Sequence, residues 1–92
     1  MSEDDFDGAV QTFRHAQEAF LKGDPTPVLE LFSRRDDATL ANPFGPPQVG
    51  WMDVAKATND AAANFTGGSI QFEEVSRYAT PDLGYVVEVE RI

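Results

Sequence analysis

The sequence predicts one small α+β domain, built in the order helix, helix, short strand, helix, strand, strand. Two observations support this prediction. Three stretches repeat apolar residues at steps of three and four, which is the spacing of one helix face, whereas later stretches alternate by twos, as strands do. The 92 residues contain no internal repeat and no linker to a second domain. We therefore expect a single domain over residues 1–92.

The first helix is predicted from about Asp4 to Lys22. Acidic residues fill its first turn, where the helix dipole favours negative charge, and Gly23 ends it as a left-handed cap. Its predicted apolar face carries Phe6, Ala9, Val10, Phe13, Ala16, Phe20 and Leu21.

A short second helix is predicted over residues 28–32. The preceding residues 24–27 offer an aspartate as N-cap and prolines near the first helical position. Residues 38–42 then alternate as a strand, with Ala38, Leu40 and Asn42 on one face. Because Leu40 is apolar, we expect this face to point toward the core.

The third helix is predicted from Trp51 to Phe65, with a glycine pair after it. A strand follows from Ile70, and two successive glutamates before Val75 break its alternation as a β-bulge does. A turn at residues 80–84 leads to the last strand. This strand places Tyr85, Val87 and Val89 on one face, and Glu88 and Glu90 on the other.

The charge of the chain excludes several classes of partner. Sixteen acidic residues against seven basic ones give a net charge of −9, which repels nucleic acids and anionic membranes. The N-terminus is acidic where a signal peptide is basic and then apolar, and no apolar run approaches the ~20 residues that span a bilayer. We expect a cytoplasmic protein that contacts neither a membrane nor a nucleic acid.

No motif predicts a cofactor, a metal or a catalytic group. The chain has no cysteine, no glycine-rich phosphate loop and no serine nucleophile elbow. His15 is the only histidine, and it lies about 200° around the helix from Phe13, so we expect it on the surface. The acidic clusters at residues 3–7 and 36–37 lack the spacing of a calcium loop.

The connection from Ala41 to Trp51 concentrates stiff and aromatic residues, with three prolines and two glycines. Asn42 could hydrogen-bond a ligand there, or its side chain could bond its own turn. The aromatic rings of Phe44 and Trp51 could stack on a ligand, or pack in the core beside the helix that follows.

The run GDPTPVLELFS followed by DDATLANPFGPPQVGW resembles the first half of the nuclear transport factor 2-like superfamily, especially its SnoaL-like and ketosteroid isomerase-like branch. The resemblance spans nearly the whole chain. It implies a cone, in which a strongly curved sheet wraps around helices and encloses a cavity for a small, mostly apolar ligand. It places Asn42 and the following loop at the lip of that cavity, and we expect Tyr85 to be the better candidate of the two tyrosines for a donor into it.

The departures from the family argue against isomerase chemistry. Steroid isomerases of the superfamily carry an aspartate base where this chain has Asn42, and an amide cannot hold a proton near neutral pH. Their oxyanion tyrosine aligns with Ala16, which has no donor, and their second oxyanion acid lies beyond the residues that align. We therefore expect no catalytic residue of that kind. The predicted ligand-binding residues are Ala16, Asn42, Phe44, Trp51 and Tyr85.

Members of the family continue with further strands, so the resemblance implies a C-terminally incomplete sheet. Either the chain is a truncated product, or a partner completes the sheet. The leading hypothesis is a homodimer that binds a small, mostly apolar molecule, without a cofactor or a metal. One alternative is an isomerase, cyclase or hydrolase acting on a hydrophobic ketone, polyketide or epoxide through unidentified acids. Another is a structural or oligomerisation fragment without a pocket, whose edge strand pairs with another chain.

Overall fold

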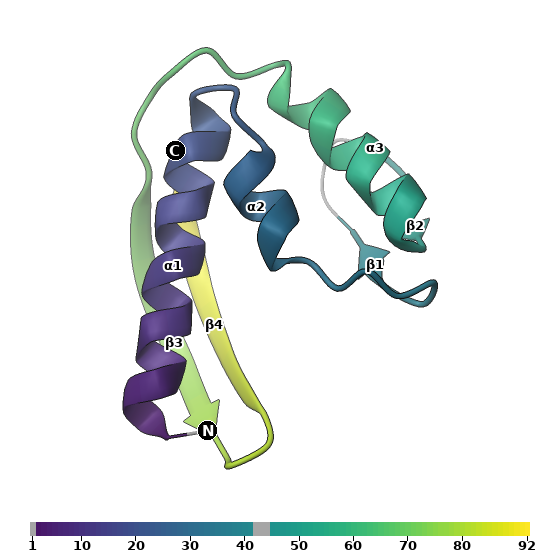
Figure 1. The fold of residues 1–92 in the computed structure, drawn as a ribbon. Helices are drawn as coiled ribbons and strands as arrows, with labels where there is room; N and C mark the ends of the chain where they lie inside the picture. The colour runs from purple at the N-terminus through teal and green to yellow at the C-terminus, as the bar shows by residue number, and fades with distance from the viewer. Residues whose placement is uncertain (1, 42–44) are drawn as a thin grey trace.

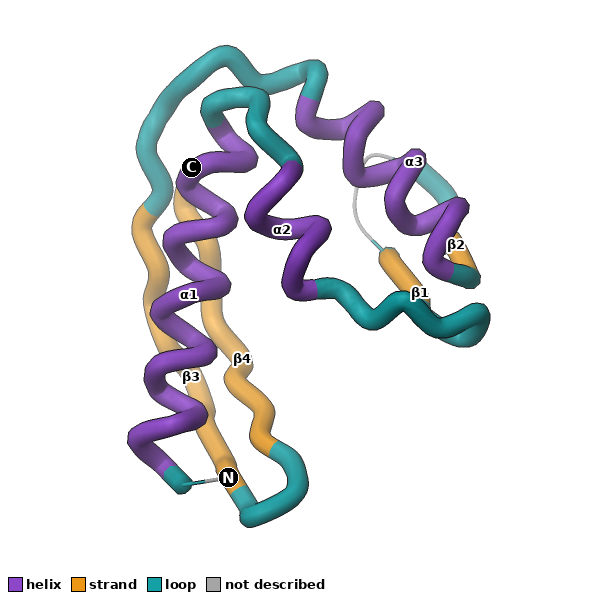
Figure 2. Tube along the Cα trace, in the orientation of Figure 1, coloured by secondary structure: helices purple, strands orange, loops and turns teal. Residues whose placement is uncertain are grey.

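The computed structural model describes residues 2–41 and 45–92, and it confirms a mixed α+β protein (Figure 1). The described residues form three helices and two separate two-stranded antiparallel sheets (Figure 2). The predicted order is observed, with one added short strand before the third helix. The elements are α1 (Glu3–Leu21), α2 (Thr26–Leu31), β1 (Thr39–Leu40), β2 (Gln48–Val49), α3 (Trp51–Ala62), β3 (Gln71–Ala79) and β4 (Gly84–Arg91).

Helix α1 is bounded by a capping box and a glycine. The Ser2 hydroxyl accepts from the Asp5 amide at 3.1 Å, and the Asp5 carboxylate accepts from the Ser2 amide at 3.4 Å. Gly23 follows α1 with a φ of 89°, as predicted. A Cβ atom there would also lie 2.8 Å from the carbonyl oxygen of Phe65, so this turn requires glycine. The expected apolar face is buried at Phe6, Val10, Ala16 and Leu21, whereas Ala9 is exposed.

Strands β3 and β4 form a hairpin that lies along α1 (Figure 1). The register shifts between Glu74 and Ser76, which confirms a bulge next to the two glutamates and places its extra residue at Val75. The turn is closed at Thr80, whose amide donates to the carbonyl of Leu83 at 2.6 Å and whose hydroxyl accepts from the Leu83 amide at 3.0 Å. The hairpin is therefore long and regular except at the bulge.

The face of the hairpin that lies against α1 is the charged one. Arg14 of α1 donates to Glu88, and Gln17 of α1 donates to Glu90. The opposite face, which carries Tyr85, Val87 and Val89, is 51%, 52% and 42% exposed at these residues. The alternation along β4 was predicted, but the side that α1 covers carries carboxylates because the helix presents an arginine and an amide to it.

The second half of the molecule packs α3 against β1 and β2 (Figure 2). The Gly50 amide donates to the carbonyl of Ala38 at 2.7 Å, which holds the start of α3 against the connection that follows α2. Helix α3 ends at Ala62, three residues earlier than predicted, because the amides of Asn64 and Phe65 bond carbonyls only three residues back. Its buried face consists of Val54, Thr58, Ala61 and Ala62.

None of the helices over the described residues is long and apolar enough to span a bilayer.

Candidate functional site

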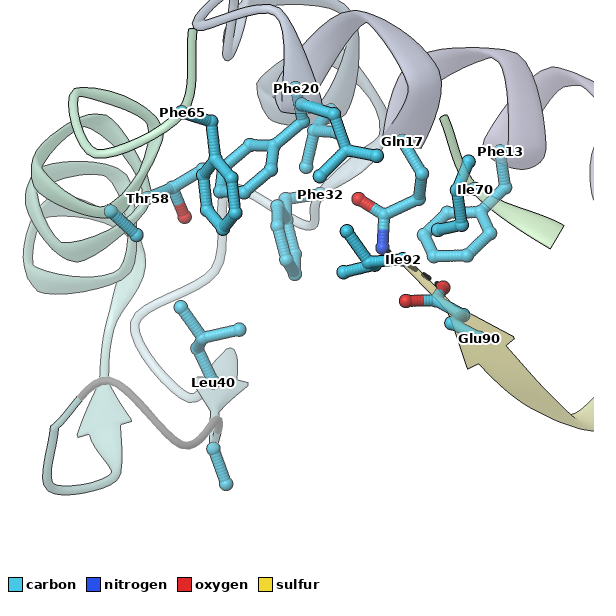
Figure 3. Close-up of a pocket in the computed structure, with 14 residues that line it drawn as sticks. Phe13, Gln17, Phe20, Phe32, Leu40, Thr58, Phe65, Ile70, Glu90 and Ile92 are labelled. Carbon is cyan, nitrogen blue, oxygen red and sulfur yellow. Dashed lines mark hydrogen bonds between the residues drawn. The ribbon is translucent and has the colours of Figure 1, made fainter. Parts of the chain in front are cut away.

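An apolar pocket lies between α1, α2 and α3, where the two halves of the molecule meet (Figure 3). Its volume is about 360 Å³, which is within the range of small-molecule sites. The strands contribute only at its edge, through β1 and the end of β4. The described lining residues are Phe13, Gln17, Phe20, Leu21, Val28, Phe32, Leu40, Ala41, Thr58, Ala61, Phe65, Ile70, Glu90 and Ile92.

Helix periodicity brings the wall residues of α1 together. Phe13, Gln17 and Phe20 follow one another at steps of four and three, so their side chains lie on one face of the helix. The rings of Phe20 and Phe65 are 5.4 Å apart and inclined by 51°, which joins α1 to the segment after α3. Phe32 lies between this pair and Gln17, and Leu40 faces it from below (Figure 3). The result is a wall of half-buried rings.

Only three of the described lining side chains have polar groups. The Thr58 hydroxyl donates to the Val54 carbonyl at 2.8 Å, so its proton is used within α3. Nε2 of Gln17 donates to Oε1 of Glu90 at 3.2 Å, at the end of the pocket near Ile92 (Figure 3). Glu90 is the single charged side chain on the described lining, and no basic side chain accompanies it there.

The structure does not bring the predicted binding residues together around this pocket. Ala16 of α1 is 3% exposed and lies in the core. Trp51 begins α3 and lies under Arg34, with the guanidinium carbon 3.8 Å from the ring centroid. Tyr85 lies at the start of β4, on the outward face, with its ring 6.1 Å from that of Tyr78. None of these three lines the pocket.

Asn42 and Phe44, the other two predicted ligand-binding residues, lie outside the described residues. The described part of the same connection contributes Ala41 to the pocket lining.

Sequence reasoning found the apolar positions of the pocket but assigned them to the core. Phe13 and Phe20 were placed on the apolar face of α1, and Phe32 and Phe65 on those of the next two helices. One signal could have indicated a site: Gln17 interrupts the apolar face of α1 with a polar group. Its partner Glu90 is 73 residues away along the chain, so local patterns do not connect the two.

A second polar cluster lies between α1 and the hairpin, outside the pocket. The Arg14 guanidinium donates to Glu88 through Nη2 at 2.6 Å and Nε at 3.0 Å, and it reaches Glu74 at 3.4 Å. The Glu88 side chain is 7% exposed, and its Oε1 accepts no hydrogen bond from the described residues. The hydrogen bond from Arg14 to Glu88 raises the pKa of Arg14, so the arginine stays charged. This cluster joins elements rather than facing a cavity.

The sequence places His15 on the surface, and it is exposed. Within residues 2–41 and 45–92, no three His, Asp or Glu side chains lie close enough together to hold a metal ion.

Comparison with known protein families, with curated proteins and with solved structures finds no match. The resemblance to the nuclear transport factor 2-like superfamily therefore stays a prediction.

Proposed function

We propose that this protein binds a small, mostly apolar molecule in the pocket between α1, α2 and α3. The observation that carries the proposal is a volume of about 360 Å³ walled by phenylalanine and aliphatic side chains, with its polar groups confined to a few positions. One water molecule occupies about 30 Å³ in the liquid, so the pocket has room for a ligand of roughly ten to twelve non-hydrogen atoms.

The chemistry of the lining favours binding over catalysis. Acid–base catalysis needs a titratable group positioned against the reacting atoms, and Glu90 is the one carboxylate on the described lining. The resemblance to the SnoaL-like branch supports the same proposal, because that branch implies a cone around an apolar cavity. The residues Asn42 and Ala16, where steroid isomerases carry a base and a donor, support a protein without isomerase chemistry.

The experiment is a titration of the ¹³C-methyl-labelled protein with octan-1-ol, followed by NMR. We expect the methyl signals of Leu40, Ile70 and Ile92 to shift, because these side chains line the pocket. The signals of Val87 and Val89 on the outward face of the hairpin report non-specific adsorption and should stay in place. Equal shifts in both groups, or none in the first, would contradict the proposal.

A pair of variants ties binding to the pocket. Phe32→Ala removes a ring from the centre of the wall, and we expect it to weaken octanol binding about tenfold through lost apolar contact. Leu83→Ala truncates a side chain that is 70% exposed in the hairpin turn, so it serves as the control and should leave the affinity unchanged. Equal affinities for all three proteins would overturn the assignment of the pocket.

We also propose that the chain forms a homodimer through the outward face of the hairpin, defined by Tyr78, Tyr85, Val87 and Val89. Tyr78 and Tyr85 are cross-strand neighbours, so the two rings and the two valines form one patch. At its end, Glu73 and Arg91 form an ion pair. This face is thus neutral on a chain of net charge −9, which lets two copies approach there without repulsion.

A further inference from the structure

We propose that the pocket selects apolar ligands whose polar head is a cationic amine and discriminates against carboxylates. This inference rests on the proposed function and specifies the class of ligand. It is drawn from the pair formed by Gln17 and Glu90, which is the polar end of an otherwise apolar lining (Figure 3).

The hydrogen bond within the pair fixes what it offers to a ligand. An ionised carboxylate only accepts hydrogen bonds, so Gln17 must turn its NH₂ group toward Glu90 and its carbonyl oxygen away. Oε1 of Glu90 is the acceptor of this bond. Oε2 of Glu90 and Oε1 of Gln17 accept no hydrogen bond from the described residues. Oε2 of Glu90 is therefore an unused acceptor at the end of the pocket, and the carbonyl oxygen of Gln17 points away from it (Figure 3).

Among the described lining residues, no cationic side chain pairs with Glu90. Arg91 follows Glu90 in β4, but it lies on the other face of the hairpin and pairs with Glu73. Arg14 precedes Gln17 by one helical turn, but its guanidinium is held by Glu88 and Glu74. A ligand head beside Glu90 therefore meets a negative charge and the unused acceptor Oε2.

The apolar side chains around Gln17 and Glu90 indicate where the alkyl chain of the ligand would lie. Phe13, Ile70 and Ile92 lie beside Gln17 and Glu90, and Phe32 separates this end from the rings of Phe20 and Phe65 (Figure 3). An alkyl chain with its head at Glu90 would pass Phe32 toward Phe20. An ammonium head gains an ion pair and hydrogen bonds, a hydroxyl gains a hydrogen bond alone, and a carboxylate is repelled.

The test compares three probes with the same alkyl chain, namely octylamine, octan-1-ol and octanoate, by methyl NMR and calorimetry near neutral pH. At this pH the amine is cationic and the acid anionic. Because Glu90 is exposed to solvent, we expect only about fivefold tighter binding of octylamine than of octanol, and a similar step from octanol to octanoate. Added salt should reduce both differences in affinity.

Two variants separate the local carboxylate from the charge of the whole chain. Glu90→Gln keeps the size and the hydrogen bond to Gln17 but removes the charge, so the three probes should bind with similar affinities. Glu73→Gln removes one negative charge from the opposite face of the same hairpin, and we expect it to preserve the order of the probes.

Octanoate binding as tightly as octylamine to the unchanged protein would overturn the selectivity while leaving the pocket in place. Equal effects of Glu73→Gln and Glu90→Gln would overturn the role of Glu90 in the same way. Binding of none of the three probes would overturn the proposed function itself, and this inference with it.

Discussion

In the β3–β4 hairpin the charged face is covered and the apolar face is exposed, which is the reverse of an ordinary half-buried sheet. The face covered by α1 holds Glu74, Arg77 and Glu88, whereas the face open to solvent holds tyrosines and valines. In most sheets the apolar face is the buried one. The difference shows that ion pairing with α1 determines which face of the hairpin is covered. Arg14 and Asp7 of α1 pair with Glu88 and Arg77 of the hairpin.

The covered face is stabilised by ion pairs that also pack on rings. The guanidinium carbon of Arg14 lies 5.5 Å from the ring centroid of Phe72, and that of Arg77 lies 5.5 Å from the ring of Phe6. The pKa of Arg77 is raised by hydrogen bonds to Asp7 and Glu74. Apolar stems and rings thus pack between the charged groups of the covered face.

The largest effect is expected from breaking the covered face at Arg14. Arg14→Met keeps an apolar side chain but leaves the Glu88 carboxylate, which is 7% exposed, without its cation. We expect the free energy of unfolding to fall by about 3 kcal/mol, since an unpaired buried charge is costly. Chemical denaturation followed by circular dichroism would measure this loss.

Two further variants test whether this loss of stability comes from the unpaired buried charge. Arg35→Met is the matched control, because Arg35 also makes two hydrogen bonds to one carboxylate but is 77% exposed, and it should change stability far less. Adding Glu88→Leu to Arg14→Met removes the stranded charge and should recover much of the stability. Equal losses for Arg14→Met and Arg35→Met would contradict the contrast between a covered and an exposed pair.

A smaller effect on stability, but a large one on assembly, is expected from the outward face. Val87→Lys puts a like charge at the centre of this face in both copies, so we expect the homodimer to dissociate while each chain unfolds at nearly the same denaturant concentration. Sedimentation equilibrium over a range of protein concentrations would measure the change. Leu83→Lys, in the exposed turn, is the control. A monomer at every concentration before substitution would contradict the proposed dimer.

Local patterns predicted the elements of the fold well. The start and end of α1 follow from acidic residues, apolar spacing and Gly23, and the bulge near Val75 follows from two successive glutamates that break the alternation. These signals lie within a few residues of the feature they predict. The turn at residues 80–84 is of the same kind, because Thr80 closes it through its own hydroxyl.

The arrangement of the site could not be predicted in the same way. Which face of β4 meets α1 depends on Arg14 and Glu88, which are 74 residues apart, and alternation along a strand is equally satisfied by either choice. Apolar residues were expected to face inward, so Tyr85 was assigned to the cavity, whereas it lies on the exposed face. The pocket likewise depends on how α3 stands relative to α1, which helix periodicity does not specify.

The smallest effect is expected at the exposed counterpart of the covered ion pair, Arg35 with Asp37. The side chains are 77% and 68% exposed and are joined by hydrogen bonds of 2.8 and 3.0 Å. The hydrogen bond from Arg35 lowers the pKa of Asp37. A lowered pKa in the folded state stabilises the protein above the unfolded pKa of about 3.9, and this contribution is lost as the pH falls through the folded value.

A carboxyl ¹³C NMR titration should therefore give Asp37 a midpoint below the usual value, and Arg35→Met should raise that midpoint toward it. Solvent screens both groups, so the variant should leave the denaturation curve near neutral pH almost unchanged. An Asp37 midpoint that is the same with and without Arg35 would show that the pair does not persist in solution. An arginine–carboxylate pair of this geometry would then contribute to stability only between α1 and the hairpin, where water is excluded from it.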